Sequence, residues 1–207
     1  MESVQKLISK IESVVEEHQN KKPDSEIKNY LFLIKRKDLS HGVKKHRQHE
    51  PLNETHQLSY HFSNNSKLAP YVYEDEDETS HVKRSVVSTN FPKDITYRAF
   101  ITSILDVFWT PYDKFHSTTL LEGNMEMLFK ELNVDTVVFD GTIDLSIRRL
   151  GNSSKSFNKL IQLLNNRFNV SVIFIAKKED GSVINYNKLN IEKSFSFMIE
   201  DVLWKNI

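Results

Sequence analysis

The sequence predicts an α/β fold with three layers, in which a mostly parallel sheet carries helices on both faces. Residues 134–176 have the pattern of a buried strand, an amphipathic helix and a second strand of continuous apolar residues. In such a βαβ unit the two strands are parallel and helices cover the sheet. The chain has 207 residues, 39% of them hydrophobic, which suffices for one domain with a substantial core.

An amphipathic helix is predicted at the N-terminus. Apolar residues recur at spacings of three and four over residues 3–18, and Pro23 ends the pattern. Acidic residues on this helix favour packing against protein rather than against a membrane. We therefore expect an N-terminal helix over 1–22, followed by a single α/β domain over 23–207.

The first half of that domain combines one clear strand with a long polar insertion. The apolar run at 27–37 predicts a buried strand, and the segment from about 38 to 80 lacks periodicity, which predicts a long inserted loop. Weaker strand candidates lie within the loop at 57–62 and 70–73. A further strand is expected at 81–90.

The second half alternates helices and strands. Helices are predicted at 94–109, at 119–132 and around 157–168, and strands at 134–139, 170–176 and 181–186. Residues 191–203 have the spacing of a closing helix, with a strand at 193–199 as the alternative.

Composition excludes several classes of protein. Lys plus Arg and Asp plus Glu both number 28, so no overall electrostatic field draws the chain to nucleic acid, and any such binding must be local. The chain has no cysteine, which excludes disulfides, thiolate nucleophiles and Cys-based metal sites. The N-terminus does not resemble a secretory signal, and no segment approaches the roughly 18 apolar residues that span a bilayer. We expect a soluble intracellular protein without a membrane partner.

Asp140 is the strongest candidate for chemistry, because it ends the predicted strand in "VVFDGT". A haloacid-dehalogenase phosphatase would need a second aspartate before the Gly141–Thr142 pair, and only one is present. A P-loop ATPase would need a glycine-rich loop ending in Lys–Ser or Lys–Thr, and none of the five glycines is followed by Lys. We therefore predict no catalytic residue and no cofactor, with an enzyme acting through Asp140 as the alternative.

The histidines give a weak metal candidate. His46 and His49 have the spacing of one helical turn, but their neighbours are basic and no carboxylate or thiolate completes a zinc set. A solvated basic loop is the favoured interpretation, and no metal is predicted.

Basic residues gather in two regions that are candidates for contact with nucleic acid. The first comprises Lys35, Arg36, Lys37, Lys44, Lys45 and Arg47, which could neutralise phosphates. The second comprises Arg148, Arg149 and Lys155, which follow the strand that ends at Asp140. Sheets of this class present their binding loops at that edge, and residues 151–153, Gly–Asn–Ser, predict a flexible turn there.

Residues 134–176, "VDTVVFDGTIDLSIRRLGNSSKSFNKLIQLLNNRFNVSVIFIA", resemble the second half of a RecA-type recombinase core. In that family the acid at the strand end serves the nucleotide and the following loop touches DNA. By matching position, Asp140 corresponds to the acid, and Arg148, Arg149 and Gly151 fall in the loop. The phosphate-binding Gly–Lys–Thr is missing, so the resemblance implies a degenerate RecA-like fold.

RecA-like proteins without the phosphate loop are known as non-catalytic subunits, among them recombinase paralogues of the yeast Shu complex and subunits of Elongator. The length and the Lys-, Asn- and Ser-rich composition resemble the former. The resemblance implies a non-enzymatic subunit of a homologous-recombination complex in the nucleus, with the cytoplasm as the alternative. Such a subunit would bind protein partners through apolar anchors, such as the N-terminal helix or Trp204, and would bind DNA weakly.

Two alternatives stay open. One is a scaffold subunit of a chromatin, kinetochore or Elongator-type assembly that binds no nucleic acid. The other concerns the fold, since a nuclease-like parallel α/β domain that has lost its acids would share the same βαβ half.

Overall fold

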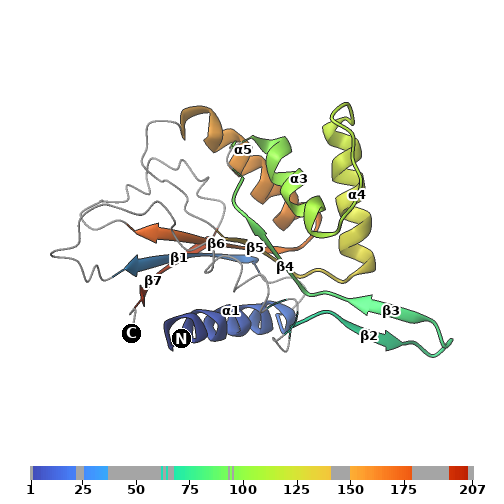
Figure 1. Ribbon diagram of the computed structural model, residues 1–207, viewed down its shortest axis with the longest axis horizontal. Coiled ribbons are helices and arrows are strands. Elements are labelled where there is room, and N and C mark those ends of the chain that lie inside the picture. The colour runs from blue at the N-terminus through green and yellow to red at the C-terminus, as the bar shows by residue number, and fades with distance from the viewer. Residues whose placement is uncertain are drawn as a thin grey trace, which may run out of the picture.

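The computed structural model describes residues 2–21, 26–36, 62, 64, 68–92, 94, 96–140, 150–178 and 196–204. The helices are α1 (Glu2–Gln19), α3 (Tyr97–Val107), α4 (Thr118–Glu131) and α5 (Leu150–Gln162), which continues into a π-helical turn, η2 (Leu163–Arg167). The strands are β1 (Lys28–Arg36), β2 (Tyr71–Glu74), β3 (Ser80–Lys83), β4 (Val86–Asn90), β5 (Thr136–Asp140), β6 (Ser171–Lys178) and β7 (Ser196–Trp204). Figure 1 shows their arrangement.

A five-stranded sheet forms the middle layer, in the order β4-β5-β6-β1-β7. Every neighbouring pair in this sheet is parallel. The first strand of the chain therefore lies inside the sheet, between β6 and β7, and the strand order requires crossovers. The predicted three-layer α/β class with a parallel sheet is confirmed.

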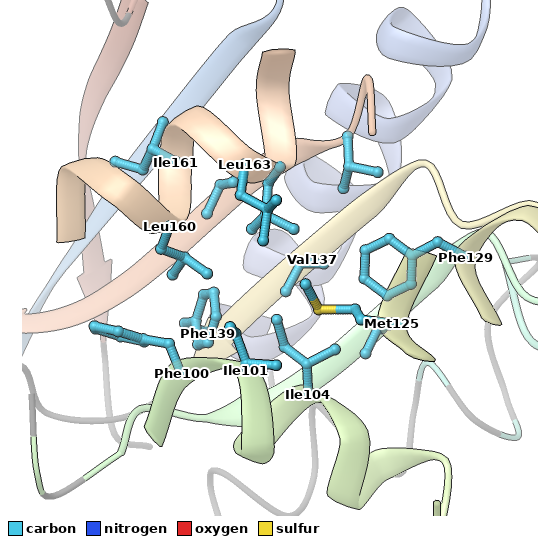
Figure 2. Close-up of a cluster of buried hydrophobic side chains, with 14 of the residues drawn as sticks. Phe100, Ile101, Ile104, Met125, Phe129, Val137, Phe139, Leu160, Ile161 and Leu163 are labelled. Atoms are coloured by element: carbon cyan, nitrogen blue, oxygen red, sulfur yellow. The ribbon is translucent and has the colours of Figure 1, made fainter. Parts of the chain in front are cut away.

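Helices α3, α4 and α5 cover one face of the sheet (Figure 1). Their apolar side chains form one core with those of the strands beneath them, and Figure 2 shows its centre, where Phe100 and Phe139 lie close together between the helices and β5. Two helices begin at hydroxyl caps: Thr96 Oγ1 accepts from Ala99 N at 3.1 Å, and Ser117 Oγ accepts from Leu120 N at 3.2 Å. Each cap satisfies a donor that a helix start leaves without a partner.

The N-terminal helix α1 covers the opposite face (Figure 1). Its buried residues Leu7, Ile8, Ile11, Val14 and Val15 join a second core with residues of β1, β4, β5 and β6. These five positions belong to the apolar stripe predicted for residues 3–18. The helix thus supplies the third layer.

Two predictions for strands and helices are wrong. The closing helix favoured at 191–203 is not formed, and the alternative of a strand at 193–199 is the one that the structure has: β7 pairs with β1 over nine residues from Lys28↔Ser196 to Arg36↔Trp204. That pairing gives hydrogen-bond partners to the backbone groups along one side of β1. The spacing of apolar residues within 191–203 carries no information about a strand so far away in the sequence. The single strand at 81–90 is divided at Arg84 and Ser85, where Ser85 O accepts from Asp135 N and Thr136 N at 2.9 and 3.0 Å.

A further prediction is wrong at the start of α5. The turn expected at 151–153 lies inside this helix, which begins at Leu150. Small polar residues and glycine are tolerated in a first helical turn, because its N–H groups lack intrahelical partners and can bond to polar side chains. The predicted strand at 181–186, residues 57–61 of the predicted strand at 57–62, and most of the loop at 38–80 lie outside the residues that the structure describes.

Candidate functional site

The carboxyl ends of the parallel strands meet at one edge of the sheet, called here the carboxyl edge. Asp140 ends β5 and lies in register between Asn90, the last residue of β4, and Ile175 of β6. Its backbone oxygen accepts a hydrogen bond from Phe91 N at 2.7 Å. The residue is only 6% exposed, so a single carboxylate is held at a fixed, largely buried position on this edge.

Basic residues share the carboxyl edge with Asp140. Strands β1 and β6 continue beyond the end of β5, and their register pairs Ile34 with Lys177 and Lys35 with Lys178. Arg36 is the last residue of β1 and is in register with Trp204 of β7. Two neighbouring strands thus end in basic residues, and we call Lys35, Arg36, Lys177 and Lys178 the basic edge.

Half of the basic edge was not predicted from the sequence. Lys35 and Arg36 were candidates, whereas Lys177 and Lys178 were not. A signal was present, because the predicted strand 27–37 ends in a run of basic residues and two lysines directly follow the predicted strand 170–176, and neighbouring parallel strands end at the same edge. Only the order β6-β1 in the sheet makes these runs adjacent.

The other predicted basic residues have different outcomes. Lys155 is exposed on α5, the helix that follows the strand ending at Asp140. Lys37, Lys44, Lys45, Arg47, Arg148 and Arg149 lie outside the described residues, and so do His46 and His49. Their roles therefore stay predictions.

The remaining cations near Lys155 on α5 and η2 are engaged by carboxylates. Lys159 Nζ lies 3.9 Å from Glu122 Oε1 and 4.0 Å from the ring centroid of Tyr97. Arg167 pairs with Glu122 at 3.4 Å and with Glu126. The Tyr97 hydroxyl donates to Glu122 at 2.8 Å, and burial followed by this acidic neighbour raises the pKa of Tyr97. This network joins α3, α4 and α5, so these cations have a structural role.

The carboxyl edge does not fit magnesium nucleotide in the way that P-loop proteins hold it. Such a site combines a strand-end acid with a glycine-rich loop whose Lys and Ser or Thr contact the phosphates and the metal. Here the acid is present, but the strand neighbours of Asp140 are Asn90 and Ile175, and no glycine in the sequence is followed by Lys. Within the described ranges, no three acidic or histidine side chains gather as a metal site.

Comparison with models of protein families assigns the chain to one of them. The model described as "Bacterial TniB protein" matches residues 57–193, which is more than half of the sequence. The chain belongs to the TniB family. The part matching TniB runs from before β2 to beyond β6 and includes Asp140, Lys155, Lys177 and Lys178. It excludes β1, and with it Lys35 and Arg36.

A solved structure agrees with this TniB assignment at the level of the fold. One chain of the "Structure of Drosophila ORC bound to GC-rich DNA and Cdc6" matches with a TM-score of 0.53 and 7% sequence identity. The match covers 97% of this chain and 29% of that one, so this chain spans less than a third of its length. No curated protein matches the chain.

Together the TniB match and the structural match support a RecA-like, P-loop-type fold. The predicted RecA-like architecture is therefore confirmed, including the helix at the N-terminus. These two matches do not support the finer resemblance to recombinase paralogues of the Shu complex. In the described part of the chain, no helix has both the length and the apolar character needed to cross a bilayer.

Proposed function

We propose that this chain is a non-enzymatic subunit of a DNA-associated complex and that it holds the DNA backbone at the carboxyl edge of its sheet. The observation that carries the proposal is the parallel register of β1 and β6, which places Lys35 beside Lys178 and Arg36 at the next position of β1. Closely spaced cations attract phosphates, and each phosphate that is neutralised releases counterions. Because the whole chain is neutral, this attraction must come from local groups of cations such as the basic edge.

The absence of a phosphate loop from the sequence supports a binding role rather than hydrolysis. One strand-end carboxylate, Asp140, stands where a P-loop protein would also need the Lys and the hydroxyl of its phosphate-binding loop. Without them, the sequence lacks the loop that cradles the β- and γ-phosphates of ATP in P-loop proteins. The cations of the basic edge would then bind a polyanion such as DNA.

The setting that we propose is a multi-subunit complex on DNA. The structural neighbour is ORC bound to GC-rich DNA and Cdc6, which supports a DNA-bound assembly as the context of this fold. More specifically, we propose a nuclear role in homologous recombination, on the basis of the RecA-type pattern of residues 134–176. Lys155 and the predicted residues Arg148 and Arg149 would extend the DNA contact beyond β5.

Reversing two charges of the basic edge is expected to weaken DNA binding. In the variant Lys35→Glu/Lys178→Glu, the association constant for a short duplex should fall about tenfold or more at moderate salt. The slope of log K against log salt should become shallower by about 2, because each lost phosphate contact removes close to one released counterion. Fluorescence anisotropy over a salt series measures both quantities.

A matched variant at the other end of the sheet is the control. Lys83 precedes β4 and Lys130 lies in the last turn of α4, so Lys83→Glu/Lys130→Glu makes the same change in net charge far from the carboxyl edge. It should leave the salt slope unchanged. Equal losses in the two variants, or no salt-dependent binding by the wild type, would reject the carboxyl edge as a DNA site and favour the scaffold alternative.

The chain is also expected to bind no ATP. Magnesium and ATP should leave its melting temperature unchanged, and purified protein should release no phosphate from ATP above a blank. A ligand that binds only the folded state at 100 times its Kd would add about 2.7 kcal/mol of stability, so thermal melting is a sensitive readout. A rise in melting temperature together with hydrolysis that Asp140→Asn abolishes would establish an enzyme instead.

A further inference from the structure

A two-stranded hairpin projects from the body of the protein and is separate from the five-stranded sheet. Strands β2 and β3 pair antiparallel from Tyr71↔Lys83 to Glu74↔Ser80, and Figure 1 shows them extending outward beyond β4. Within the described part of the chain, each of these strands pairs only with the other. The outer edge of such a pair presents backbone N–H and C=O groups that can bond to a further strand.

The two faces of the hairpin differ in chemistry. Residues that lie directly opposite each other in an antiparallel pair share a face. The register therefore places Tyr71, Tyr73 and His81 on one face, which we call the aromatic face. The Tyr73 and His81 rings stack with centroids 5.4 Å apart, and the Tyr71 and Tyr73 centroids are 6.1 Å apart. Val72 and Val82 pair on the other face.

These apolar side chains are open to solvent. Tyr71 is 51% exposed and Val72 is 66% exposed, and Tyr73 and Val82 are also exposed. Every residue of β2 is exposed, whereas β3 alternates between exposed and half-buried residues. The outer edge of β2 is thus the more accessible of the two edges. An exposed apolar surface on a projecting element typically marks a contact with another protein.

The tip of the hairpin is acidic throughout. Residues 74–78 are all Glu or Asp, and Lys83 is the one Lys or Arg from Tyr71 to Lys83. Adjacent carboxylates repel one another, and they also repel the phosphates of DNA, so the tip is complementary to a cationic partner. The partner that fits both the tip and the exposed faces combines basic with apolar residues.

The turn at this tip is ordered by Asp75. Its Oδ1 accepts from the backbone N–H groups of Asp77 and Thr79 at 3.0 and 2.9 Å, and its Oδ2 lies 2.7 Å from His81 Nε2. Glu78 has a φ of 59°, in the left-handed region where glycine is the usual residue. The turn thus carries a carboxylate where the backbone favours glycine. A hairpin that is ordered before it meets a partner loses less conformational entropy on binding.

We propose that a basic, extended segment of another protein adds to the outer edge of β2 as a third strand. Side chains alternate between the two faces of a strand. Alternate arginines of the partner would stack on Tyr71 and Tyr73 and pair with carboxylates of the tip, which is how guanidinium groups meet both kinds of group. The apolar residues between them would lie beside Val72. Main-chain hydrogen bonds give affinity in such strand addition, and the alternating side chains give specificity.

This inference does not rest on the proposed contact with DNA. The hairpin joins β4 at the amino end of the sheet, whereas the basic edge lies at the carboxyl end. The nine residues of β1 alone separate the two ends by about 26 Å at roughly 3.3 Å per residue. Because the two surfaces are apart, the hairpin can be tested on the full chain without DNA.

The probe is a labelled, end-blocked heptapeptide in which arginine and valine alternate. Fluorescence anisotropy should show saturable binding to the wild type, and replacing the arginines of the peptide with glutamates should abolish it. A peptide with every backbone nitrogen methylated keeps its side chains but has no backbone donors. It should bind about tenfold or more weakly, since strand addition depends on main-chain hydrogen bonds. Equal binding of the methylated peptide would overturn strand addition.

Two variants of the chain test the tip and the aromatic face. Glu76→Lys/Asp77→Lys reverses charges of the tip but keeps Asp75, and it should weaken peptide binding about tenfold or more. Tyr71→Leu/Tyr73→Leu keeps apolar bulk but removes the rings, and it should weaken binding about fivefold. Tyr71→Phe/Tyr73→Phe keeps the rings and should bind within about twofold of the wild type.

Asp94→Lys/Glu131→Lys is the matched control for the tip variant, since both carboxylates are exposed and lie outside the hairpin. It should bind the peptide like the wild type, and circular dichroism should show that all variants are folded. A wild type that does not bind the arginine peptide would overturn the proposal. Equal losses in the tip variant and its control, or unchanged binding by the folded leucine variant, would overturn it as well.

Discussion

Phe100→Ala is expected to lower the free energy of unfolding by about 3–5 kcal/mol. The Phe100 side chain is fully buried on α3. Its ring centroid lies 5.2 Å from that of Phe91, 5.6 Å from that of Phe139 and 6.2 Å from that of Phe157, all in edge-on contacts. Removing the ring leaves a cavity and also breaks three aromatic pairs. Urea unfolding followed by circular dichroism measures the change.

Phe115→Ala is the control for this substitution. The Phe115 ring is 81% exposed, so its loss should change stability by no more than about 0.5 kcal/mol. Similar urea midpoints for Phe100→Ala and Phe115→Ala would show that the aromatic cluster does not hold α3 on the sheet.

The position of Phe100 links this core to the candidate site. It packs against Phe139 (Figure 2), and Phe139 directly precedes Asp140 at the end of β5. Phe91, another neighbour, donates its N–H to the Asp140 oxygen. The layer beneath α3 thus fixes the ends of β4 and β5. We expect partial unfolding there to disturb the carboxyl edge first.

Elements with strong local patterns could be predicted from the sequence. The stripe over residues 3–18 became α1, and the βαβ pattern of 134–176 became β5, α5 and β6 in the predicted order. In both cases the apolar period lies within the element and reports its buried face directly. The boundaries moved by only a few residues, as frayed ends allow.

Features that depend on pairing between distant segments could not be predicted. Residues 196–204 have apolar spacing that favoured a helix and left a strand only as the alternative, and they form a strand because one side of β1 is available to pair with them. The basic edge has the same origin, since Lys35 and Lys178 are far apart in sequence and become neighbours only through the strand order. Local propensity is overridden in both cases by the backbone hydrogen bonds of the sheet.

A second large effect is expected from Asn165→Ala, which should destabilise the fold by about 2–4 kcal/mol. Asn165 lies in η2 and exchanges two side-chain hydrogen bonds with Asn29 of β1, at 2.7 and 3.0 Å. Its Nδ2 also donates to Val170 O at 2.8 Å, and Asn29 Oδ1 accepts from Val172 N at 2.9 Å. Both side chains are buried, so alanine leaves polar groups without partners where water does not reach them. Thermal or urea unfolding gives the loss.

Asn166→Ala on the same turn is the matched control, since Asn166 is exposed and should change stability by no more than about 0.5 kcal/mol. A double-mutant cycle with Asn29→Ala separates the pair from its surroundings. If the two amides act as a unit, the double variant should lose less stability than the sum of the single losses, by at least about 0.5 kcal/mol. Additive losses would mean that each amide serves only its own backbone partner. A coupled pair would show that Asn29 and Asn165 tie the start of β1 to the π-helical turn before β6, and so help to set the register on which the basic edge depends.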